Sequence, residues 1–335
     1  MSVPERRQPT RWCMNRRRFL AVSVASAFAG SALAQTAPAG LMRIIVAYPT
    51  GGPSDAVARA LAEKLSAQLA TQVIIENRAG AGGSVGIDAM AKSAPDGLTL
   101  AFAAVSPITL NPHINTKLGY DPFRDVAPVA VVMISPVYVL ATPAFSGKTF
   151  GDVIALARAQ PGALRLATSG VATVGHLMLE QIKAKAGVDI THIPYKGGGQ
   201  AITDAVGGQF ELLLANPSPA LTGQTASGRL RLLAVAAPQR LASYPTIPTL
   251  TELGFAAANL SSTFGIFAPG KTPAATLTRL NAAINKALEL PEVRERLLRL
   301  ENLPAIMNPA EFAQLLRHEH DANASIVRSA NIRAE

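Results

Sequence analysis

Short apolar runs alternate with amphipathic stretches along the chain. The run RIIVAY (43–48) is followed by a turn and by DAVARALAEKLSAQL (55–69), in which alanines and leucines recur every three or four residues, and QVIIENR (72–78) is again apolar. Because residues at that spacing share one face of a helix, the middle stretch predicts a helix that packs on a sheet. Strand, helix, strand is the order of an α/β domain with a largely parallel sheet.

A similar alternation recurs further along the chain, and the last stretch is helical. We expect a helix over roughly 84–94 and a strand over 98–104, followed by a second set of alternating elements. That set comprises helices at 150–160, 174–186 and 198–206, strands at 163–169, 189–195, 210–215 and 230–237, and closing helices at 273–290, 291–300 and 309–330. Two α/β units in one chain imply a cleft between them.

The segment from Val126 to Phe145 is apolar and carries no charge. Pro128, Pro136 and Pro143 interrupt it, and a proline inside a helix removes an N–H donor and clashes with the preceding turn. The segment therefore predicts two or three short buried strands rather than a membrane helix.

The N-terminal segment has the features of a secretory signal peptide. Three arginines (16–18) precede an apolar stretch over 19–34 that ends in the small-residue pattern Ala-Leu-Ala. We expect cleavage after Ala34 and export; Sec and twin-arginine (Tat) signals both remain open, as do Met1 and Met14 as the start. A membrane anchor is the alternative, but about 15 apolar residues fall short of the roughly 20 that a spanning helix needs.

Charge and cysteine content exclude several classes of function. The 335 residues carry a net charge of +9, but residues 1–35 contribute +5 of it, and subtraction leaves +4 for the rest. That excess lacks the basic stripe with interleaved aromatics of a nucleic-acid interface, so we expect no nucleic-acid partner. Cleavage after Ala34 would remove Cys13, the only cysteine, and with it any disulfide, thiolate nucleophile or cysteine-based metal site.

A glycine-rich turn separates the first predicted strand from its helix. Tyr48 to Asp55 reads YPTGGPSD, in which Gly51 and Gly52 let the backbone approach a ligand closely and Ser54 or Asp55 can cap the helix. The first amides of a helix have no partner within it, and the helix dipole favours an anion, so the turn predicts a carboxylate or phosphate site. A P-loop would need a lysine after the glycines, and none is present. A capped helix after a tight turn is the alternative.

Similar turns follow predicted strands in the second half of the chain. ATSGVATVGH places Ser169 and Thr173 at the start of a helix, where His176 on the same face could reach the cleft or serve as a capping or core histidine. YKGGGQ (195–200) opens the next helix, and Asn216 ends a strand. Ligands of open α/β sheets bind at the carboxyl ends of the strands, so we expect a ligand at these turns.

Two further motifs point to other functions. Gly82-Gly83-Ser84-Val85-Gly86 fits the G-x-S-x-G pattern, but a nucleophile elbow needs its serine at the end of a strand, and the preceding strand ends about eight residues earlier. An exported serine hydrolase that uses Ser84 stays as the alternative function. The same glycines lack the last glycine of a dinucleotide-binding turn, and His318 and His320 face different sides of a helix, so we expect neither a cofactor nor a metal.

Five ordered blocks of the sequence resemble the extracytoplasmic solute receptors of tripartite tricarboxylate transporters, the Bug or TctC-like family. The blocks are IIVAYPTGGPSDAVARALAEKL, VIIENRAGAGGSVGIDAMAKSAPDGLTL, LGYDPFRDVAPVA, GHLMLEQIKAKAGVDITHIPYKGGGQAITDAVGGQ and YPTIPTLTELGF. The resemblance implies a two-lobed α/β fold, the type II periplasmic-binding-protein fold of the Venus-flytrap kind, with mixed, largely parallel sheets. Its ligand cleft would lie between lobe 1 (41–138 plus 260–335) and lobe 2 (139–259).

The resemblance also implies a function and a set of ligand contacts. The protein would be a periplasmic, monomeric, non-enzymatic receptor for a small organic carboxylate, whether a di- or tricarboxylate, an aromatic acid or an amino acid. It would deliver the ligand to transporter membrane subunits or report it to a sensor protein. The carboxylate would meet the amides of Gly51, Gly52 and Ser54 and the Ser54 hydroxyl in the turn from Tyr48 to Asp55. The other expected contacts are Ser106, Ser169, Thr173, His176, Tyr195 and Asn216.

Overall fold

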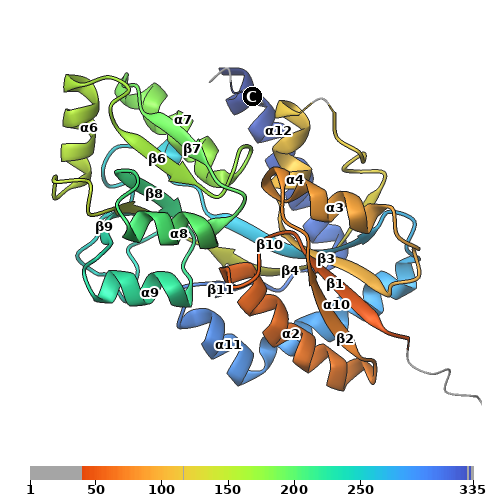
Figure 1. Ribbon diagram of the computed structural model, residues 1–335. Coiled ribbons are helices and arrows are strands. Elements are labelled where there is room, and N and C mark those ends of the chain that lie inside the picture. Colours follow the sequence, from red (N-terminus) through yellow and green to blue (C-terminus); the bar gives the residue numbers. More distant parts are fainter. Residues whose placement is uncertain (1–39, 116, 330–331, 333–335) are drawn as a thin grey trace, which may run out of the picture. The chain divides into compact units, whose positions relative to one another are not determined.

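The computed structural model describes residues 40–115, 117–329 and 332. Within them the chain forms two β-sheets with helices packed against them (Figure 1). The predicted signal peptide and its cleavage site after Ala34 lie outside the described residues.

The first sheet has six strands in the order β11-β4-β10-β3-β1-β2. Its strands are β1 (Met42–Val46), β2 (Val73–Asn77), β3 (Thr99–Ala104), β4 (Val126–Ser135), β10 (Ser262–Pro269) and β11 (Leu303–Pro304). β1 pairs in parallel with β2 and β3, whereas β10 runs antiparallel to β3 and β4.

The second sheet has five strands in the order β7-β6-β8-β5-β9. Its strands are β5 (Val137–Ala141), β6 (Arg165–Thr168), β7 (Thr191–Pro194), β8 (Leu212–Ala215) and β9 (Arg231–Ala236). β6 pairs in parallel with β7 and β8, whereas β5 runs antiparallel to β8 and β9.

The chain crosses between the sheets twice. β4 in the first sheet is followed directly by β5 in the second, with only Pro136 between them, and β10 returns the chain to the first sheet after β9. A strand that enters from the other sheet needs no crossover helix, and it pairs antiparallel. The sheets are therefore mixed, as expected: β1–β3 and β6–β8 pair in parallel, and the crossing strands pair antiparallel. The predicted lobe boundaries stay a prediction.

The prolines of the uncharged segment do not act alike. Pro136 separates β4 from β5, and Pro143 follows the end of β5, as expected. Pro128 lies inside β4, opposite Phe267 and beside a shift in the strand register. An irregular position of this kind accommodates a residue that cannot donate to the ladder. The expectation that all three prolines interrupt the strands is wrong at Pro128.

Each predicted helix is present, with ends that differ by a few residues, and three short helices over 106–109, 111–114 and 219–226 were not predicted. The helices are α2 (Pro53–Leu69), α3 (Ser84–Ala91), α4 (Ser106–Thr109), α5 (Asn111–Ile114), α6 (Phe150–Ala159), α7 (Val174–Ala186), α8 (Gly198–Val206), α9 (Pro219–Ala226), α10 (Ala274–Glu289), α11 (Pro291–Leu298) and α12 (Pro309–Ser329), with short 3-10 turns η1 (Ala81–Gly83) and η2 (Ala256–Ala258). None of the described helices combines the length and the apolarity needed to cross a membrane.

The first sheet is buried on both faces, which explains the unbroken apolar run of β1. Ile44 contributes to a core with Leu61 of α2 and Ile284 of α10, while Ile45 contributes to a second core with Ile87 of α3. Alternate residues of a strand point to opposite faces, so neighbouring isoleucines serve different cores. Each such side chain contributes about 1.5–3 kcal/mol when fully buried.

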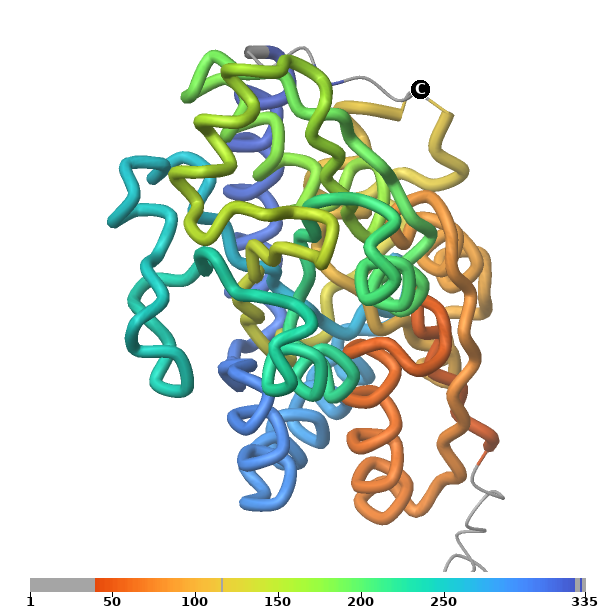
Figure 2. Tube along the Cα trace, turned by 60° about the vertical axis from the view of Figure 1, so that its left-hand side comes forward, coloured from red at the N-terminus to blue at the C-terminus, as the bar shows by residue number. Residues whose placement is uncertain are grey.

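The last helix, α12, extends along the molecule past the first sheet, as the blue segment of Figures 1 and 2 shows. Phe312 near its start packs in the first sheet's core. Val327 near its end packs against Leu110 of the first half and Leu177 of α7. The C-terminal helix therefore contacts elements associated with both sheets.

Candidate functional site

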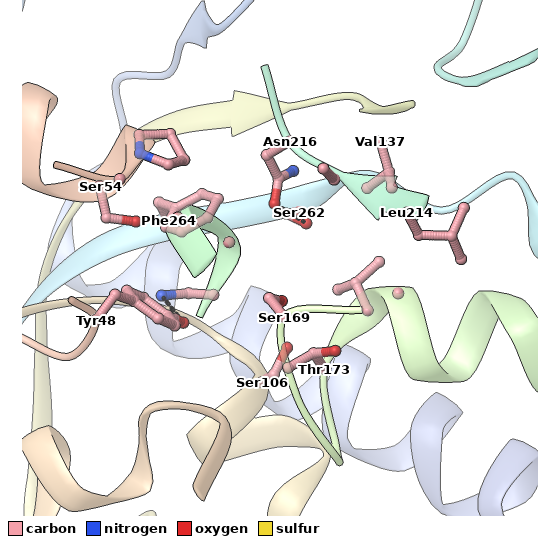
Figure 3. A pocket seen from close by; sticks show the side chains of 18 of the residues that line it. Tyr48, Ser54, Ser106, Val137, Ser169, Thr173, Leu214, Asn216, Ser262 and Phe264 are labelled. Atoms are coloured by element: carbon pink, nitrogen blue, oxygen red, sulfur yellow. Dashed lines mark hydrogen bonds between the residues drawn. The ribbon is translucent and has the colours of Figure 1, made fainter. Parts of the chain in front are cut away.

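A cavity lies where strands of both sheets end (Figure 3). The turns that follow β1, β3, β6 and β8 contribute to it, as do the first residues of β5 and β10. The structure brings seven of the predicted contacts together in its wall: Tyr48, Gly52, Ser54, Ser106, Ser169, Thr173 and Asn216. It places four elsewhere: Gly51, Asp55, His176 and Tyr195.

The carboxylate of Asp55 stabilises the turn that follows β1. This buried carboxylate accepts hydrogen bonds of 3.0 Å each from the Gly51 amide, the Arg59 Nε and the Asn77 Nδ2. Burial alone would raise the pKa of Asp55, but the hydrogen bonds from Arg59, Gly51 and Asn77 outweigh it and hold the pKa below its ordinary value. Asn77 also donates to the Tyr48 carbonyl at 3.0 Å. Asp55 therefore positions the turn.

This arrangement corrects two expectations about the turn. The N-cap of α2 is Gly52 with extended backbone, Pro53 is at the first helical turn, and no side chain caps the helix. Ser54 and Asp55 lie within the helix, so neither is the N-cap. The Gly51 amide, expected to meet a ligand, donates to Asp55 instead, because the carboxylate one turn into the helix reaches back to it.

Tyr48 presents a phenol to the cavity. Its Oη accepts the Ala104 N–H at 3.2 Å, which leaves its own proton for an acceptor. Burial raises the pKa of Tyr48 to about 12, against a smaller lowering by that hydrogen bond. Tyr48 therefore stays protonated and is a donor at any physiological pH. Its ring packs edge-on against Phe264 of β10, with centroids 6.3 Å apart.

On the other side of the cavity, Thr173 caps α7. Its Oγ1 accepts the His176 N–H at 3.4 Å and donates to the Gly170 carbonyl at 2.8 Å. The hydroxyl is thus committed to the turn, and Thr173 shapes the wall more than it offers a donor. Ser169, between β6 and this cap, has no side-chain hydrogen bond to the described residues and is available to a ligand.

His176 does not reach the cavity. Its Nδ1 accepts the Ala172 N–H at 3.2 Å, and its ring stacks on His192 with centroids 4.3 Å apart. Desolvation lowers the pKa of His192 to about 3, with a further lowering by the neighbouring His176. His192 is therefore neutral, and its Nε2 lies 2.8 Å from Thr168 Oγ1. His176 therefore lies outside the cavity wall and packs on His192, away from the position expected for a ligand contact.

Tyr195 and Asn216 have structural partners as well. The Tyr195 hydroxyl donates to Asp204 at 2.7 Å, which turns it away from the cavity. The Asn216 Nδ2 donates to the Pro136 carbonyl at 3.0 Å and to Ser135 Oγ at 3.2 Å. Asn216 therefore lies in the cavity wall while tying β8 to the crossover between β4 and β5.

Several wall residues were absent from the predicted contacts. Gly198 and Gly199 open α8, whose N-cap Gly197 leaves the helix without a side-chain cap. The sequence predicts a turn at these glycines, but neither glycine is among the predicted ligand contacts. Ser262 and Phe264 come from β10. They follow a long connection and belong to an apolar strand without any turn signal, so only the tertiary structure brings them to the cavity.

The wall of the cavity combines helix N-termini with an absence of charged side chains among the described residues that line it. Among the described residues, those that line it are all neutral at pH 7. The first residues of α2, α7 and α8 form part of its wall, and these helices have 17, 13 and 9 residues. Each N-terminus offers unpaired amides and a positive dipole end, worth about 0.3–1 kcal/mol to an anion and up to about 2 when partly buried.

Ser84, the nucleophile of the alternative hydrolase, is buried outside the cavity wall. Its Oγ accepts a short hydrogen bond from Asn111 Nδ2 and lies 3.1 Å from the Tyr120 hydroxyl, which donates to the Pro107 carbonyl at 2.7 Å. None of these partners is a general base. Within the described residues no group of three or more metal-binding side chains occurs.

The structure has two sheets linked by crossing strands, and helix N-termini line the cavity where the strands end. This arrangement defines a two-lobed solute-binding protein of the periplasmic type. The model of the tripartite tricarboxylate transporter family receptor matches residues 57–332. The chain belongs to this family, as its sequence blocks predicted.

Known relatives support the assignment over nearly the whole chain. The chain is 35% identical to Protein BugT of Bordetella pertussis over 320 residues, which cover 94% of this chain and 98% of BugT. A solved periplasmic transporter matches with a TM-score of 0.84 at 35% identity, covering 89% of this chain and 99% of that one.

Two further solved structures contain a bound acid. MatC from Rhodopseudomonas palustris with bound malate matches with a TM-score of 0.81 at 29% identity, over 87% of this chain and 99% of that one. A second protein from the same organism, with adipate, matches with a TM-score of 0.84 at 28% identity, over 88% and 99%. The predicted fold class is confirmed by these likenesses.

Proposed function

We propose that this protein captures a small organic carboxylate in the periplasm for a tripartite tricarboxylate-type transporter. The observation that carries the proposal is the convergence of three helix N-termini on a cavity without a charged side chain. Such a site stabilises an anion by fixed amides and dipoles, and it releases the anion more readily than an arginine clamp would. Reversible capture is what delivery to a membrane partner requires.

The cavity has the donors for a small acid. The hydroxyls of Ser54, Ser106 and Ser169 have no side-chain hydrogen bond to the described residues and can donate to a carboxylate. Malate and adipate, held by two structural neighbours, belong to the same chemical class.

The remaining parts of the proposal concern export, oligomeric state, signalling and the absence of an enzyme activity. Its N-terminal segment directs export and is cleaved after Ala34, and the released chain works as a monomer. Lobe closure over the ligand signals occupancy to the transporter membrane subunits or to a sensor protein. We assign it no enzyme activity, because none of the described residues that line the cavity is a histidine, a carboxylate or a lysine that could activate its serines, and Ser84 is held by Asn111 and Tyr120 outside the wall.

A ligand panel tests the proposal directly. We expect at least one mono-, di- or tricarboxylate or aromatic acid to raise the melting temperature of the purified protein, following RT ln(1 + [L]/Kd). A Kd near 1 μM corresponds to about 8 kcal/mol of binding free energy. Absence of any shift, together with no acid co-purifying by mass spectrometry, would contradict the receptor. An esterase activity abolished by Ser84→Ala would favour the hydrolase instead.

A further inference from the structure

We propose that two residues outside the cavity wall, Thr168 and His176, position Ser169 for the ligand. This inference rests on the proposed function and adds to it residues that the ligand itself does not touch. Ser169 and Thr173 both line the cavity (Figure 3), and the turn over 169–173 joins β6 to α7. The backbone of this turn therefore decides where the Ser169 hydroxyl lies.

The turn contains an uncommon backbone conformation at Ala172. Its φ is 54°, in the left-handed region that residues with a Cβ seldom adopt. Such a conformation persists only where its surroundings enforce it, and residues of this kind cluster at binding sites and active sites. Ala172 is also buried, so its N–H needs a partner within the protein.

His176 supplies that partner. Its Nδ1 accepts the Ala172 N–H at 3.2 Å, and its own backbone N–H donates to Thr173 Oγ1 at 3.4 Å. His176 thus ties the last two residues of the turn to the first turn of α7. Loss of the Nδ1 acceptor would leave the buried amide of Ala172 unpaired, which favours a different backbone conformation of the turn.

Thr168 holds the other end of the turn. Its hydroxyl accepts the Gly170 N–H at 3.2 Å and donates to the Gly170 carbonyl at 3.1 Å. Because the single hydroxyl proton is then used, the Nε2 of His192, 2.8 Å away, is the donor in its contact with Thr168. The ring of His192 stacks on His176, so the supports of the two ends pack against each other. Ser169 lies between them.

Variants of His176 test the inference through affinity, with stability measured beside it. With an acid that binds the unsubstituted protein, we would measure Kd by titration calorimetry and the free energy of unfolding by urea. His176→Phe keeps an aromatic ring against His192 and removes the acceptor, and it should weaken binding at least tenfold. His176→Asn, whose Oδ1 can take the place of Nδ1, should recover at least half of the lost binding free energy. A His176→Asn variant as weak as His176→Phe would overturn the role of the acceptor.

A double-mutant cycle tests whether His176 acts through Ser169. In a Ser169→Ala protein, His176→Phe should cost less affinity than in the unsubstituted protein, because no hydroxyl remains to be misplaced. An equal loss in both backgrounds would overturn the assigned route through Ser169.

A second variant changes the other end of the turn. Thr168→Val is nearly isosteric and removes the hydroxyl that holds Gly170, so it should also weaken binding at least tenfold; it carries the test if His176→Phe does not fold, which circular dichroism would show. Ile182→Val, more than two helical turns beyond Thr173 and buried in another part of α7, is the matched control: it should lower stability and bind normally.

The outcomes separate the inference from the proposed function. Normal affinity of a folded Thr168→Val or His176→Phe variant would overturn the role of the residue that it changes and leave the receptor standing. A loss of affinity in Ile182→Val as large as theirs would overturn the inference, because reduced stability alone would then explain it. Binding of no acid to the unsubstituted protein would contradict the receptor and the inference with it.

Discussion

The polar residues around the cavity are of two kinds: some line the cavity, and others hold the lining residues in place. Ser54 and Asp55 are neighbours in α2, yet Ser54 lines the cavity while the carboxylate of Asp55 ties Gly51, Arg59 and Asn77 together. Consecutive helical residues point about 100° apart, so adjacent polar residues serve different purposes. Their substitutions should accordingly have different effects.

Ser54→Leu should weaken ligand binding at least tenfold while the protein stays folded. The larger side chain fills space at the wall and removes a hydroxyl that is free to donate. Titration calorimetry with the best acid of the panel measures the effect. Ala67→Leu, on an exposed position of the same helix, is the matched control and should bind normally. Equal affinities of the two variants would move the site away from this turn.

Asp55→Asn should destabilise the protein by about 1–3 kcal/mol, the cost of breaking hydrogen bonds to a buried charged group. The pKa of Asp55 is depressed in the folded state, so its contribution is present above its unfolded pKa of about 3.9 and is lost as the pH falls through the lower folded value. Urea unfolding should therefore show the variant's deficit at pH 7 and a smaller deficit near pH 3.

The matched control for Asp55 is Glu63→Gln, which removes an exposed carboxylate from the same helix. That control should change the free energy of unfolding by a few tenths of a kcal/mol at both pH values. A deficit of Asp55→Asn that is the same at both pH values would contradict the assigned charge of Asp55.

At the scale of elements, the packing of α12 against β10 partly buries the carboxyl group of Glu319. Burial raises the pKa of Glu319 to about 7, against a smaller lowering by its hydrogen bond with Thr263. An acid whose pKa is higher in the folded state than the unfolded value of about 4.3 costs stability as the pH rises between the two values. We therefore expect the contact of α12 with β10 to weaken as the pH rises through neutrality.

Glu319→Gln should remove that sensitivity. Between pH 5 and pH 8, we expect the free energy of unfolding of the unsubstituted protein to fall relative to the variant by up to about 3 kcal/mol, which corresponds to the shift between the two pKa values. Chemical denaturation at the two pH values gives the difference. Glu311→Gln, which changes a carboxylate near the start of the same helix, serves as the control. Parallel pH profiles for all three proteins would contradict the buried carboxyl.

At the scale of the whole molecule, two glycines lie at contacts between elements of the two sheets. A Cβ on Gly82, which follows β2, would lie 2.7 Å from the carbonyl oxygen of Val171, which follows β6. A Cβ on Gly197 would lie 2.4 Å from Pro49 Cδ. Real Cβ atoms do not approach other atoms so closely, so both contacts depend on glycine.

Gly82→Ala should therefore hinder closure of the lobes and weaken ligand binding at least tenfold. Gly187→Ala is a close control: its φ of 63° matches the 62° of Gly82, and its added Cβ would meet nothing within 4 Å. Both variants should lose about 1 kcal/mol of stability from the positive φ. Only Gly82→Ala should lose affinity and show a larger radius of gyration with ligand by X-ray scattering. Equal affinities would show that this contact does not control closure.

The sequence by itself determined the features that arise from local physical chemistry. Apolar periodicity located α2 and α7, and glycines marked the turns after β1 and before α8, because spacing and backbone freedom are properties of neighbouring residues. The ordered blocks determined the family, and the sequence singled out the turn of Tyr48 and Ser54, which the structure places in the cavity wall. These signals need no knowledge of distant contacts.

Only the tertiary structure decided which way side chains face and which donors stay free. The ring of His176 stacks on His192, and the Gly51 amide donates to Asp55. Ser262 lines the cavity although its strand lies far along the chain from the turn after β1. The antiparallel crossing strands likewise follow from the passage of the chain between two sheets. A hydrogen-bond donor serves one partner at a time, and that partner is set by three-dimensional proximity, which sequence spacing does not contain.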